Sequence, residues 1–286
     1  MDPVPSTQTQ KWPGKHADLD PEPSLLRYCD GRVHVGSGKL AEKKTLLTGG
    51  DSGIGKAAAV MFAREGSDLV ISCLPEERDD AEVTRDLIER EGRNCWIWEG
   101  KLDKSDNCRD LVDFALKKLG WIDVLVNNIA YQQVAQSIED IDDEQWDLTF
   151  KTNIFSFFWV TKAAISHMKS GSSIVNCSSI NAYVGRPDLL DYTSTKGAIT
   201  AFTRGLSNQY AQHGIRVNAV APGPIYTPLV SSTFPKEKIE LSDQVPLGRM
   251  GQPVEVASCY LFLACSDGGY MTGQTLHPNG GTVINN

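Results

Sequence analysis

Short apolar strands alternate with amphipathic helices along most of the chain, and this alternation constrains the possible folds more than any other feature. We expect strands at 44–48, 68–73, 94–98, 123–126, 173–177, 215–220 and 274–276. We expect helices at 56–64, 80–91, 107–119, 143–168, 193–212 and 254–265. Strands that alternate with helices lie parallel in one sheet with helices on both faces. The sequence therefore predicts an α/β domain with a doubly wound sheet, whose ligands bind at the carboxyl ends of the strands.

A glycine-rich turn at 49–55 joins the first expected strand to the first expected helix. Glycines at such a turn let the backbone approach a pyrophosphate closely while the N–H groups of the helix point at it. The spacing Thr-Gly-x-x-x-Gly-x-Gly differs from the usual G-x-G-x-x-G, and a glycine-rich turn alone is a weak signal. Its position between a strand and a helix makes it a candidate site for a dinucleotide phosphate.

Tyr192 and Lys196 are four residues apart in a segment that we expect to be helical, so they share one face of the helix. A free tyrosine has a pKa near ~10 and exchanges protons poorly at neutral pH. A neighbouring ammonium favours the phenolate and lowers that pKa. Such a tyrosine can take a proton from an alcohol or give one to a carbonyl. A lone pair of this kind is more often a packing tyrosine beside a solvated lysine.

Residues 1–39 differ in composition from the rest of the chain. The first 36 residues contain five prolines, and proline at this density prevents a long helix or a central strand. Two interpretations stay open, a disordered tail or an irregular arm that lies on the domain or on a neighbouring subunit. In the second, the anchors would be Trp12, Leu25, Leu26 and Tyr28.

Composition excludes several classes of function. A formal charge of −8 and a pI near 5.2 argue against a nucleic-acid-binding surface. No apolar run approaches the ~20 residues of a membrane span, and the N-terminus lacks a secretion signal. The seven cysteines form no C-x-x-C motif and no metal-ligand pattern with histidine. We therefore expect no metal site, and reduced thiols in a cytoplasmic protein.

Six motifs follow one another along the chain: Thr48-Gly49-x-x-x-Gly53-x-Gly55, Asn127-Asn128-x-Ala130, Asn153, Ser179, Tyr192-x-x-x-Lys196 and Pro222-Gly223-Pro224-Ile225-x-Thr227. In order and spacing they resemble the short-chain dehydrogenase/reductase superfamily, whose single domain has a Rossmann-type sheet. The resemblance covers residues 40–286. The N-terminal arm, residues 74–77 and the ending 276–282 resemble the glucose/ribitol dehydrogenase-like branch, also called general-stress oxidoreductases.

The resemblance implies four catalytic residues. Tyr192 would be the general acid/base, and Lys196 would lower its pKa and hold the nicotinamide ribose. Ser179 would bind the substrate oxygen and stabilise the charge that develops on it. Asn153 would hold a water that links Lys196 to solvent.

The resemblance also implies a set of cofactor-binding residues. The phosphates and ribose would be held by Gly49, Ser52, Gly53, Ile54 and Gly55. The adenine and its ribose would be flanked by Leu102 and Asn128, and the carboxamide would be fixed by Ile225 and Thr227. Two positions depart from the family pattern: Ile129 adds bulk near the cofactor, and Lys101 stands where an adenine-contacting Asp is usual.

The end of the second strand bears on the choice between NAD and NADP. An acid there binds the ribose hydroxyls of NAD, and a nearby base accommodates the 2′-phosphate of NADP. Here the strand ends at Cys73 with no acid, and the first base is Arg78. The nearby Glu76 and Glu77 argue against a phosphate. We expect NADP(H) to be slightly favoured over NAD(H), with dual use as the alternative.

The resulting functional hypothesis is an NAD(P)(H)-dependent oxidoreductase that interconverts a carbonyl and a secondary alcohol. Two alternatives remain: imine or alkene reduction, or coupled redox isomerisation, at the same site; and a non-catalytic dinucleotide-binding regulator. The substrate pocket would come from Asn181, Ala182, Tyr183, Arg186 and a loop at 226–245, whose aromatic residues suit a small cyclic or apolar molecule. The resemblance implies a homotetramer.

Overall fold

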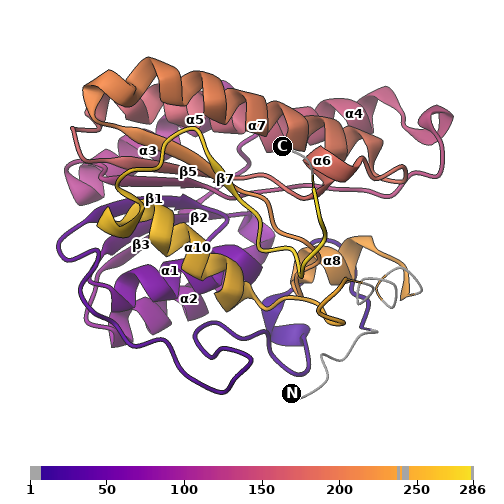
Figure 1. The fold of residues 1–286 in the computed structure, drawn as a ribbon, viewed down its shortest axis with the longest axis horizontal. Coiled ribbons are helices and arrows are strands. Elements are labelled where there is room, and N and C mark those ends of the chain that lie inside the picture. Colours follow the sequence, from indigo (N-terminus) through magenta and orange to yellow (C-terminus); the bar gives the residue numbers. More distant parts are fainter. Residues whose placement is uncertain (1–7, 237–238, 240–244, 285–286) are drawn as a thin grey trace.

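The computed structural model describes residues 8–236, 239 and 245–284. Its centre is a seven-stranded parallel sheet in the order β3-β2-β1-β4-β5-β6-β7 (Figure 1). The strands are β1 (Lys44–Thr48), β2 (Asp68–Cys73), β3 (Cys95–Glu99), β4 (Val124–Asn127), β5 (Ser173–Cys177), β6 (Arg216–Val220) and β7 (Thr275–Leu276). The order reverses at β1, between β2 and β4, as in a doubly wound sheet. The predicted α/β fold class is confirmed.

Helices cover both faces of the sheet. The α-helices of the described residues are α1 (Gly53–Arg64), α2 (Arg78–Arg90), α3 (Ser105–Leu119), α4 (Asp143–Phe150), α5 (Ser156–Ala164), α6 (Asn181–Val184), α7 (Leu190–Tyr210), α8 (Pro228–Thr233) and α10 (Pro253–Ala264). Helices α1, α2 and α10 form one hydrophobic core with one face of the sheet. Helices α3 and α5 form a second core with the other face, and the last turns of α7 pack against it.

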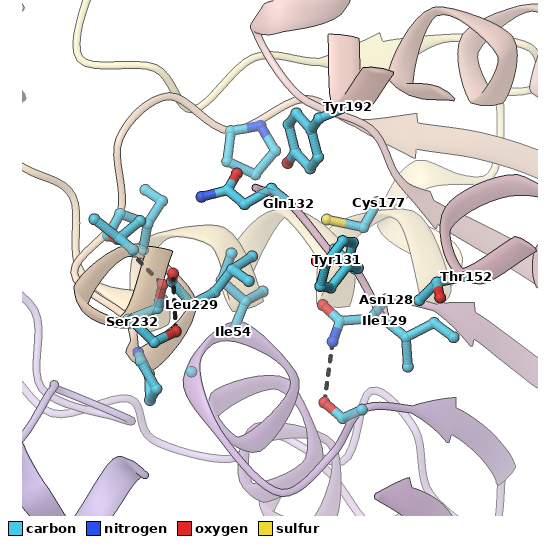
Figure 2. A pocket seen from close by; sticks show the side chains of 18 of the residues that line it. Ile54, Asn128, Ile129, Tyr131, Gln132, Thr152, Cys177, Tyr192, Leu229 and Ser232 are labelled. Carbon is cyan, nitrogen blue, oxygen red and sulfur yellow. Dashed lines mark hydrogen bonds between the residues drawn. The ribbon is translucent and has the colours of Figure 1, made fainter. Parts of the chain in front are cut away.

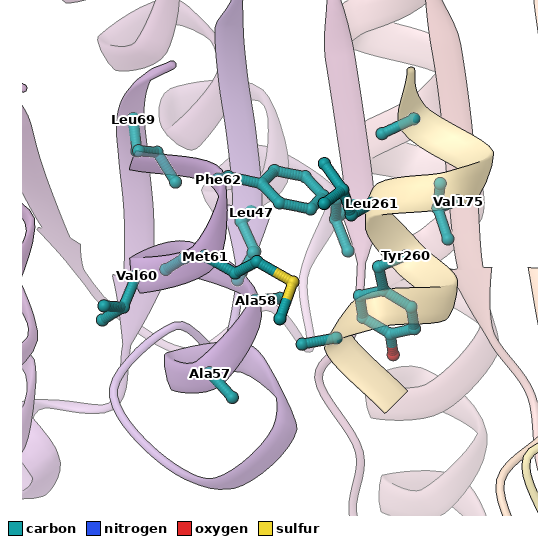
Figure 3. Close-up of a cluster of buried hydrophobic side chains, with 14 of the residues drawn as sticks. Leu47, Ala57, Ala58, Val60, Met61, Phe62, Leu69, Val175, Tyr260 and Leu261 are labelled. Atoms are coloured by element: carbon teal, nitrogen blue, oxygen red, sulfur yellow. The ribbon is translucent and has the colours of Figure 1, made fainter. Parts of the chain in front are cut away.

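Helix α1 lies directly against α10, as Figure 3 shows. Ala57 and Ala58 of α1 are fully buried, and their small side chains let the two helices approach closely. Met61 and Phe62 of α1 fill the remaining space near Tyr260 of α10. Burying one such large side chain contributes about 1.5–3 kcal/mol. This packing fixes the start of α1, which carries the glycine-rich turn.

The predicted helix at 143–168 is interrupted in the structure. Helix α4 ends at Phe150, a π-helical turn covers Lys151–Phe155, and α5 continues from Ser156 to Ala164. A π-helical turn inserts one extra residue into the helix and often marks a functional site. Here it contains Asn153, which is fully buried.

The described part of the N-terminal arm lies on its own domain. Leu25, Leu26 and Tyr28 pack against the core formed by α1 and α10. The hydroxyl of Tyr28 is 3.0 Å from that of Ser258 in α10. Further along, Glu65 at the end of α1 accepts hydrogen bonds from the backbone N–H groups of residues 37 and 39, each 2.9 Å long.

Candidate active site

A cavity of about 800 Å³ lies at the carboxyl ends of the strands (Figure 2). Ten of the predicted catalytic and cofactor-binding residues line it: Gly49, Ser52, Gly53, Ile54, Leu102, Asn128, Tyr192, Lys196, Ile225 and Thr227. Helix α8 forms another part of its wall, through side chains that include Leu229 and Ser232. The sheet therefore brings most of the predicted site together at the edge where doubly wound folds bind ligands.

The glycine-rich turn is too tight for larger residues. A Cβ at Gly55 would lie 1.7 Å from the carbonyl oxygen of Gly49. Gly53 has a φ of +51°, a left-handed conformation that favours glycine, and a Cβ there would lie 3.1 Å from the side chain of Thr227. Residues 49 and 51–54 of this turn line the cavity. This arrangement suits a pyrophosphate, and the residues present fit a dinucleotide.

The side chain of Asn128 fixes the glycine-rich turn from the neighbouring strand. Its Nδ2 donates to the carbonyl oxygens of Thr48 (3.2 Å) and Gly49 (3.0 Å). Its Oδ1 accepts a 3.1 Å hydrogen bond from the buried hydroxyl of Tyr260 in α10. Asn128 also lines the cavity, so it supports the turn and faces the ligand space together.

Tyr192 and Lys196 occupy the first turns of α7 and are both buried, with Lys196 fully enclosed. The ammonium of Lys196 lies 5.2 Å from the ring centroid of Tyr192 and donates a 2.8 Å hydrogen bond to the carbonyl oxygen of Cys177. The hydroxyl of Ser179 lies close enough to Tyr192 to lower the pKa of its phenol. Ser179 in the loop after β5 and the two predicted catalytic side chains on α7 are therefore adjacent.

The pKa of Tyr192 is raised above its ordinary value, chiefly because burial penalises the phenolate, while the nearby Ser179 hydroxyl lowers it. Burial also lowers the pKa of Lys196. Desolvation is the largest influence on the pKa of both groups, and the lowering of the Tyr192 pKa by Lys196 stays a prediction. Tyr192 is accordingly held as a neutral phenol, a proton donor.

Asn153 lies behind the cavity wall rather than in it. Its Oδ1 accepts a hydrogen bond from the backbone N–H of Tyr131 (2.7 Å). Its Nδ2 donates to the carbonyl oxygen of Tyr131 (2.8 Å) and to the hydroxyl of Thr195 in α7 (3.1 Å). The side chain thus connects the π-helical turn to α7 and to the loop after β4.

Comparison with known proteins places this geometry in a family. A family model described as enoyl-(acyl carrier protein) reductase matches residues 49–283. The chain is 44% identical to the glucose and ribitol dehydrogenase of Daucus carota, over 98% of this chain and 97% of that protein. It is 46% identical to the NADPH-dependent aldehyde reductase 1, chloroplastic, of Arabidopsis thaliana, over 96% of each. The chain belongs to the short-chain dehydrogenase/reductase family.

A solved family structure supports the assignment. The short-chain dehydrogenase from Burkholderia cenocepacia J2315, in complex with NADP, superposes with a TM-score of 0.80 and 27% identity, covering 85% of this chain and 98% of that one. The predicted family and its glucose/ribitol dehydrogenase-like branch are confirmed. The protein is an NAD(P)-dependent short-chain dehydrogenase/reductase.

At the adenosine end, this short-chain dehydrogenase/reductase does not bring Arg78 into the cavity. Arg78 forms ion pairs with Glu82 and, at 2.6 Å, with Glu99 on β3, and it is not among the described residues that line the cavity. Lys101, noted in the sequence as a departure from the family pattern, does line it. So does Glu77, whose pKa burial and the nearby Asp51 raise to about 8.

At the substrate end, Asn181 and Arg186 line the cavity as predicted, whereas Ala182 and Tyr183 do not appear among the described lining residues. The guanidinium of Arg186 lies 4.5 Å from the ring centroid of Phe234 and forms a 2.7 Å ion pair with Asp188. Residues 237–238 and 240–244 of the predicted loop lie outside the described residues.

Three lining residues that sequence reasoning did not place in the site come from the N-terminal arm: Trp12, Pro13 and Gly14. Trp12 was an expected anchor, but nothing local indicated what it would contact. Among the described residues, no group of three or more His, Cys, Asp or Glu side chains is placed to hold a metal ion. No helix in the same described part of the chain is long and apolar enough to span a bilayer.

Proposed function

We propose that this enzyme interconverts a carbonyl and an alcohol by hydride transfer, with Tyr192 as the general acid/base. The observation that carries the proposal is that Tyr192, Ser179 and Lys196 meet beside a cavity whose glycine-rich turn fits a pyrophosphate. The names of two relatives support the same chemistry, since one is an aldehyde reductase and the other a glucose and ribitol dehydrogenase.

The dinucleotide would be held by the turn at 49–55 and by Ile225 and Thr227, and when bound it supplies or accepts the hydride. Ser179 orients the substrate oxygen toward the Tyr192 hydroxyl. In the reductive direction, Tyr192 donates its proton to that oxygen as negative charge develops there. Lys196 lies over the Tyr192 ring, where its positive charge stabilises the phenolate that results.

Burial raises the pKa of Tyr192, so the neutral phenol, which is the form that donates the proton in carbonyl reduction, is the form present in this structure. A phenol held neutral by burial is ready to donate a proton, whereas alcohol oxidation needs the phenolate at the start. The cavity beside Tyr192 is lined by Tyr131, Val184 and Phe234, which suit a small substrate with an apolar or cyclic body.

NADP(H) is the slightly favoured cofactor in this proposal. The related structure from B. cenocepacia contains NADP, and the Arabidopsis relative is named as NADPH-dependent. Lys101 is the lining cation at the end of the cavity formed by the β2–α2 and β3–α3 loops. It can serve the role that the sequence assigned to Arg78, which is held by Glu82 and Glu99.

Self-association into a homotetramer is also part of this proposal. Helix α4, the π-helical turn and α5 expose Trp146, Phe155 and Phe158, respectively, each more than 40% accessible. Ring contacts connect Trp146 through Phe150 to Phe155. A continuous aromatic surface of this kind is typical of protein contact sites. Light scattering of the purified protein would show a tetramer's mass, and a monomer would refute this part.

The seven free thiols favour a reducing compartment such as the cytoplasm.

The decisive experiment is Tyr192→Phe assayed with NADPH on a panel of aldehydes, ketones and sugars. The variant should bind NADPH normally and lose about 10²–10⁴-fold in turnover, the usual contribution of a general acid. Tyr210→Phe, at the far end of the same helix, is the matched control and should keep full activity. Full activity of Tyr192→Phe would refute the proposal and favour imine or alkene reduction. NADPH binding by wild type without turnover of any carbonyl would favour a non-catalytic role.

A further inference from the structure

A short piece of the N-terminal arm crosses the cavity of the active site. Residues 12–14 line that cavity, although about 35 residues of chain separate them from the glycine-rich turn. They are the only described residues N-terminal to β1 that do so. The arm therefore contributes to the ligand space directly, in addition to covering the core formed by α1 and α10.

One side of this crossing rests on α8. The backbone N–H of Gln10 donates a 2.7 Å hydrogen bond to the carbonyl oxygen of Ser231. At Gly14 the arm lies so close that a Cβ would be 2.7 Å from the carbonyl oxygen of Pro228 and 3.1 Å from the Cβ of Ser232. The glycine is needed there because any larger residue would push the arm away from α8.

The other side of the crossing is an aromatic contact. The ring of Trp12 meets that of Tyr131 edge to face, with the centroids 5.7 Å apart and the planes at 84°. Tyr131 belongs to the loop after β4, and Asn153 holds its backbone in place. Residues 10–14 therefore span from α8 to the β4 side of the cavity.

The arm is then anchored at the phosphate-binding turn. His16 is fully buried, and its Nδ1 accepts a 3.3 Å hydrogen bond from the backbone N–H of Gly53 at the start of α1. Its own backbone N–H donates to Asp80 in α2 (2.7 Å). Burial lowers the pKa of His16 to about 3, so the ring stays neutral and can accept the hydrogen bond.

Trp12 and His16 differ in how deeply they are buried. His16 has no exposed surface, whereas 45% of the Trp12 side chain is accessible. Trp12 is therefore the less firmly held part of the segment, and its side chain can move away from Tyr131 while His16 stays in place.

We propose that residues 10–16 are a further cofactor-binding element, in which Trp12, Pro13 and Gly14 cover the bound dinucleotide and slow its release. This proposal depends on the NAD(P)-dependence of the enzyme but not on the catalytic role proposed for Tyr192. Exchange of the cofactor then requires the Trp12 contact with Tyr131 to break, while His16 keeps the arm attached beside the glycine-rich turn.

The test is the rate of NADPH release from the full-length protein without substrate, followed by nicotinamide fluorescence after mixing with excess NADP⁺. Trp12→Ala should release NADPH about tenfold faster, the upper range for losing one aromatic contact, with little change in the association rate. Lys11→Ala is the matched control, because Lys11 is exposed on the same arm and does not line the cavity. An unchanged release rate in Trp12→Ala would overturn the proposal.

A second measurement uses the wild-type chain and guards against a folding defect in the variant. Lys11 and Lys15 are exposed trypsin sites on the two sides of the crossing. Bound NADPH should slow cleavage at both sites several-fold, because the covered ligand holds the arm down. Cleavage at the same rate with and without NADPH would overturn the proposal, and neither readout depends on which carbonyl the enzyme reduces.

Discussion

The side-chain amide of Asn153 binds both backbone polar groups of Tyr131, accepting from its N–H at 2.7 Å and donating to its carbonyl oxygen at 2.8 Å. This pairing joins the π-helical turn between α4 and α5 to the loop that follows β4. Tyr131 in turn contacts Trp12 of the arm. Asn153 therefore supports the wall of the cavity that faces the arm, in addition to its contact with Thr195 in α7.

Replacement of Asn153 by alanine should destabilise the protein and slow turnover. It leaves the N–H and carbonyl oxygen of Tyr131 without these partners, and each unsatisfied buried group costs about 1–3 kcal/mol. We expect the free energy of unfolding to fall by about 2–4 kcal/mol and kcat to fall at least about tenfold. Urea unfolding and steady-state kinetics measure the two effects.

Asn107→Ala is a suitable control for that experiment. Asn107 also donates one side-chain hydrogen bond to a backbone carbonyl, that of Lys101 at 2.8 Å, but on the surface. Its loss should change stability by less than about 1 kcal/mol. Equal effects of the two alanine substitutions would contradict the role assigned to Asn153.

The interruption at Asn153 shows where sequence reasoning reached its limit in the fold. The bounds predicted for β1, β2 and β5 are those of the structure, because short apolar runs between turns leave few alternatives. The helix at 143–168 was predicted as continuous. Asparagine has poor helix propensity, but a π-helical turn depends on the contacts with Tyr131 and Thr195, which no local pattern encodes.

In the site, the sequence predicted the motif residues that line the cavity, but it did not predict contacts between residues far apart in the chain. The glycine-rich turn and Tyr192 line the cavity because local spacing positions them on a strand end and a helix face. Arg78 was expected to face the cofactor, but it donates a hydrogen bond to Glu99 on β3, which is 21 residues away in the sequence. Trp12 lines the cavity because of the course that the arm takes over the domain. The arm has irregular backbone, and no local sequence pattern predicts such a course.

Replacing Gly55 by alanine should abolish tight dinucleotide binding. The added Cβ would lie 1.7 Å from the carbonyl oxygen of Gly49 and 2.7 Å from Nδ2 of Asn128, so the turn must open. We expect the Kd for NADPH to rise at least about 100-fold, since the phosphate loses most of its backbone contacts. Fluorescence titration measures the Kd.

The matched variant for Gly55 is Gly197→Ala in the interior of α7. No atom lies within 4 Å of the Cβ position at Gly197, and alanine has a better helix propensity by about 1 kcal/mol. This variant should bind NADPH as wild type does and unfold at the same or a higher temperature. Normal binding by Gly55→Ala would show that the turn is not the phosphate site.

The side chain that makes the enzyme bind NADPH more tightly than NADH should be Lys101 rather than Arg78. Lys101 lines the cavity, whereas Arg78 is paired with Glu82 and Glu99. We expect Lys101→Ala to weaken NADPH binding about fivefold and NADH binding little, because an exposed ion pair contributes up to about 1 kcal/mol. Arg78→Ala should change neither Kd. A selective loss of NADPH affinity in Arg78→Ala alone would restore the assignment made from the sequence.

Glu77 should make the stability of the protein depend on pH. Burial and the neighbouring Asp51 raise its pKa from 4.5 to about 8. The folded chain then binds the Glu77 proton more tightly than the unfolded chain does. This contribution to stability is fully present below pH 4.5 and is lost as the pH rises to about 8. Glu77→Gln removes the charge, so the variant should melt above wild type at pH 8, by roughly 2–4 °C for each kcal/mol gained.

The difference between Glu77→Gln and wild type should shrink as the pH is lowered toward 5, where both side chains are largely uncharged. Thermal unfolding followed by circular dichroism from pH 5 to 9 measures the two curves. Glu76→Gln is the control, because Glu76 is exposed, next in sequence and absent from the described cavity lining. Parallel curves for Glu77→Gln and wild type would show that Glu77 ionises normally in the folded protein. A converging pair would show that a protonated carboxyl lies at the adenosine end of the cofactor cavity.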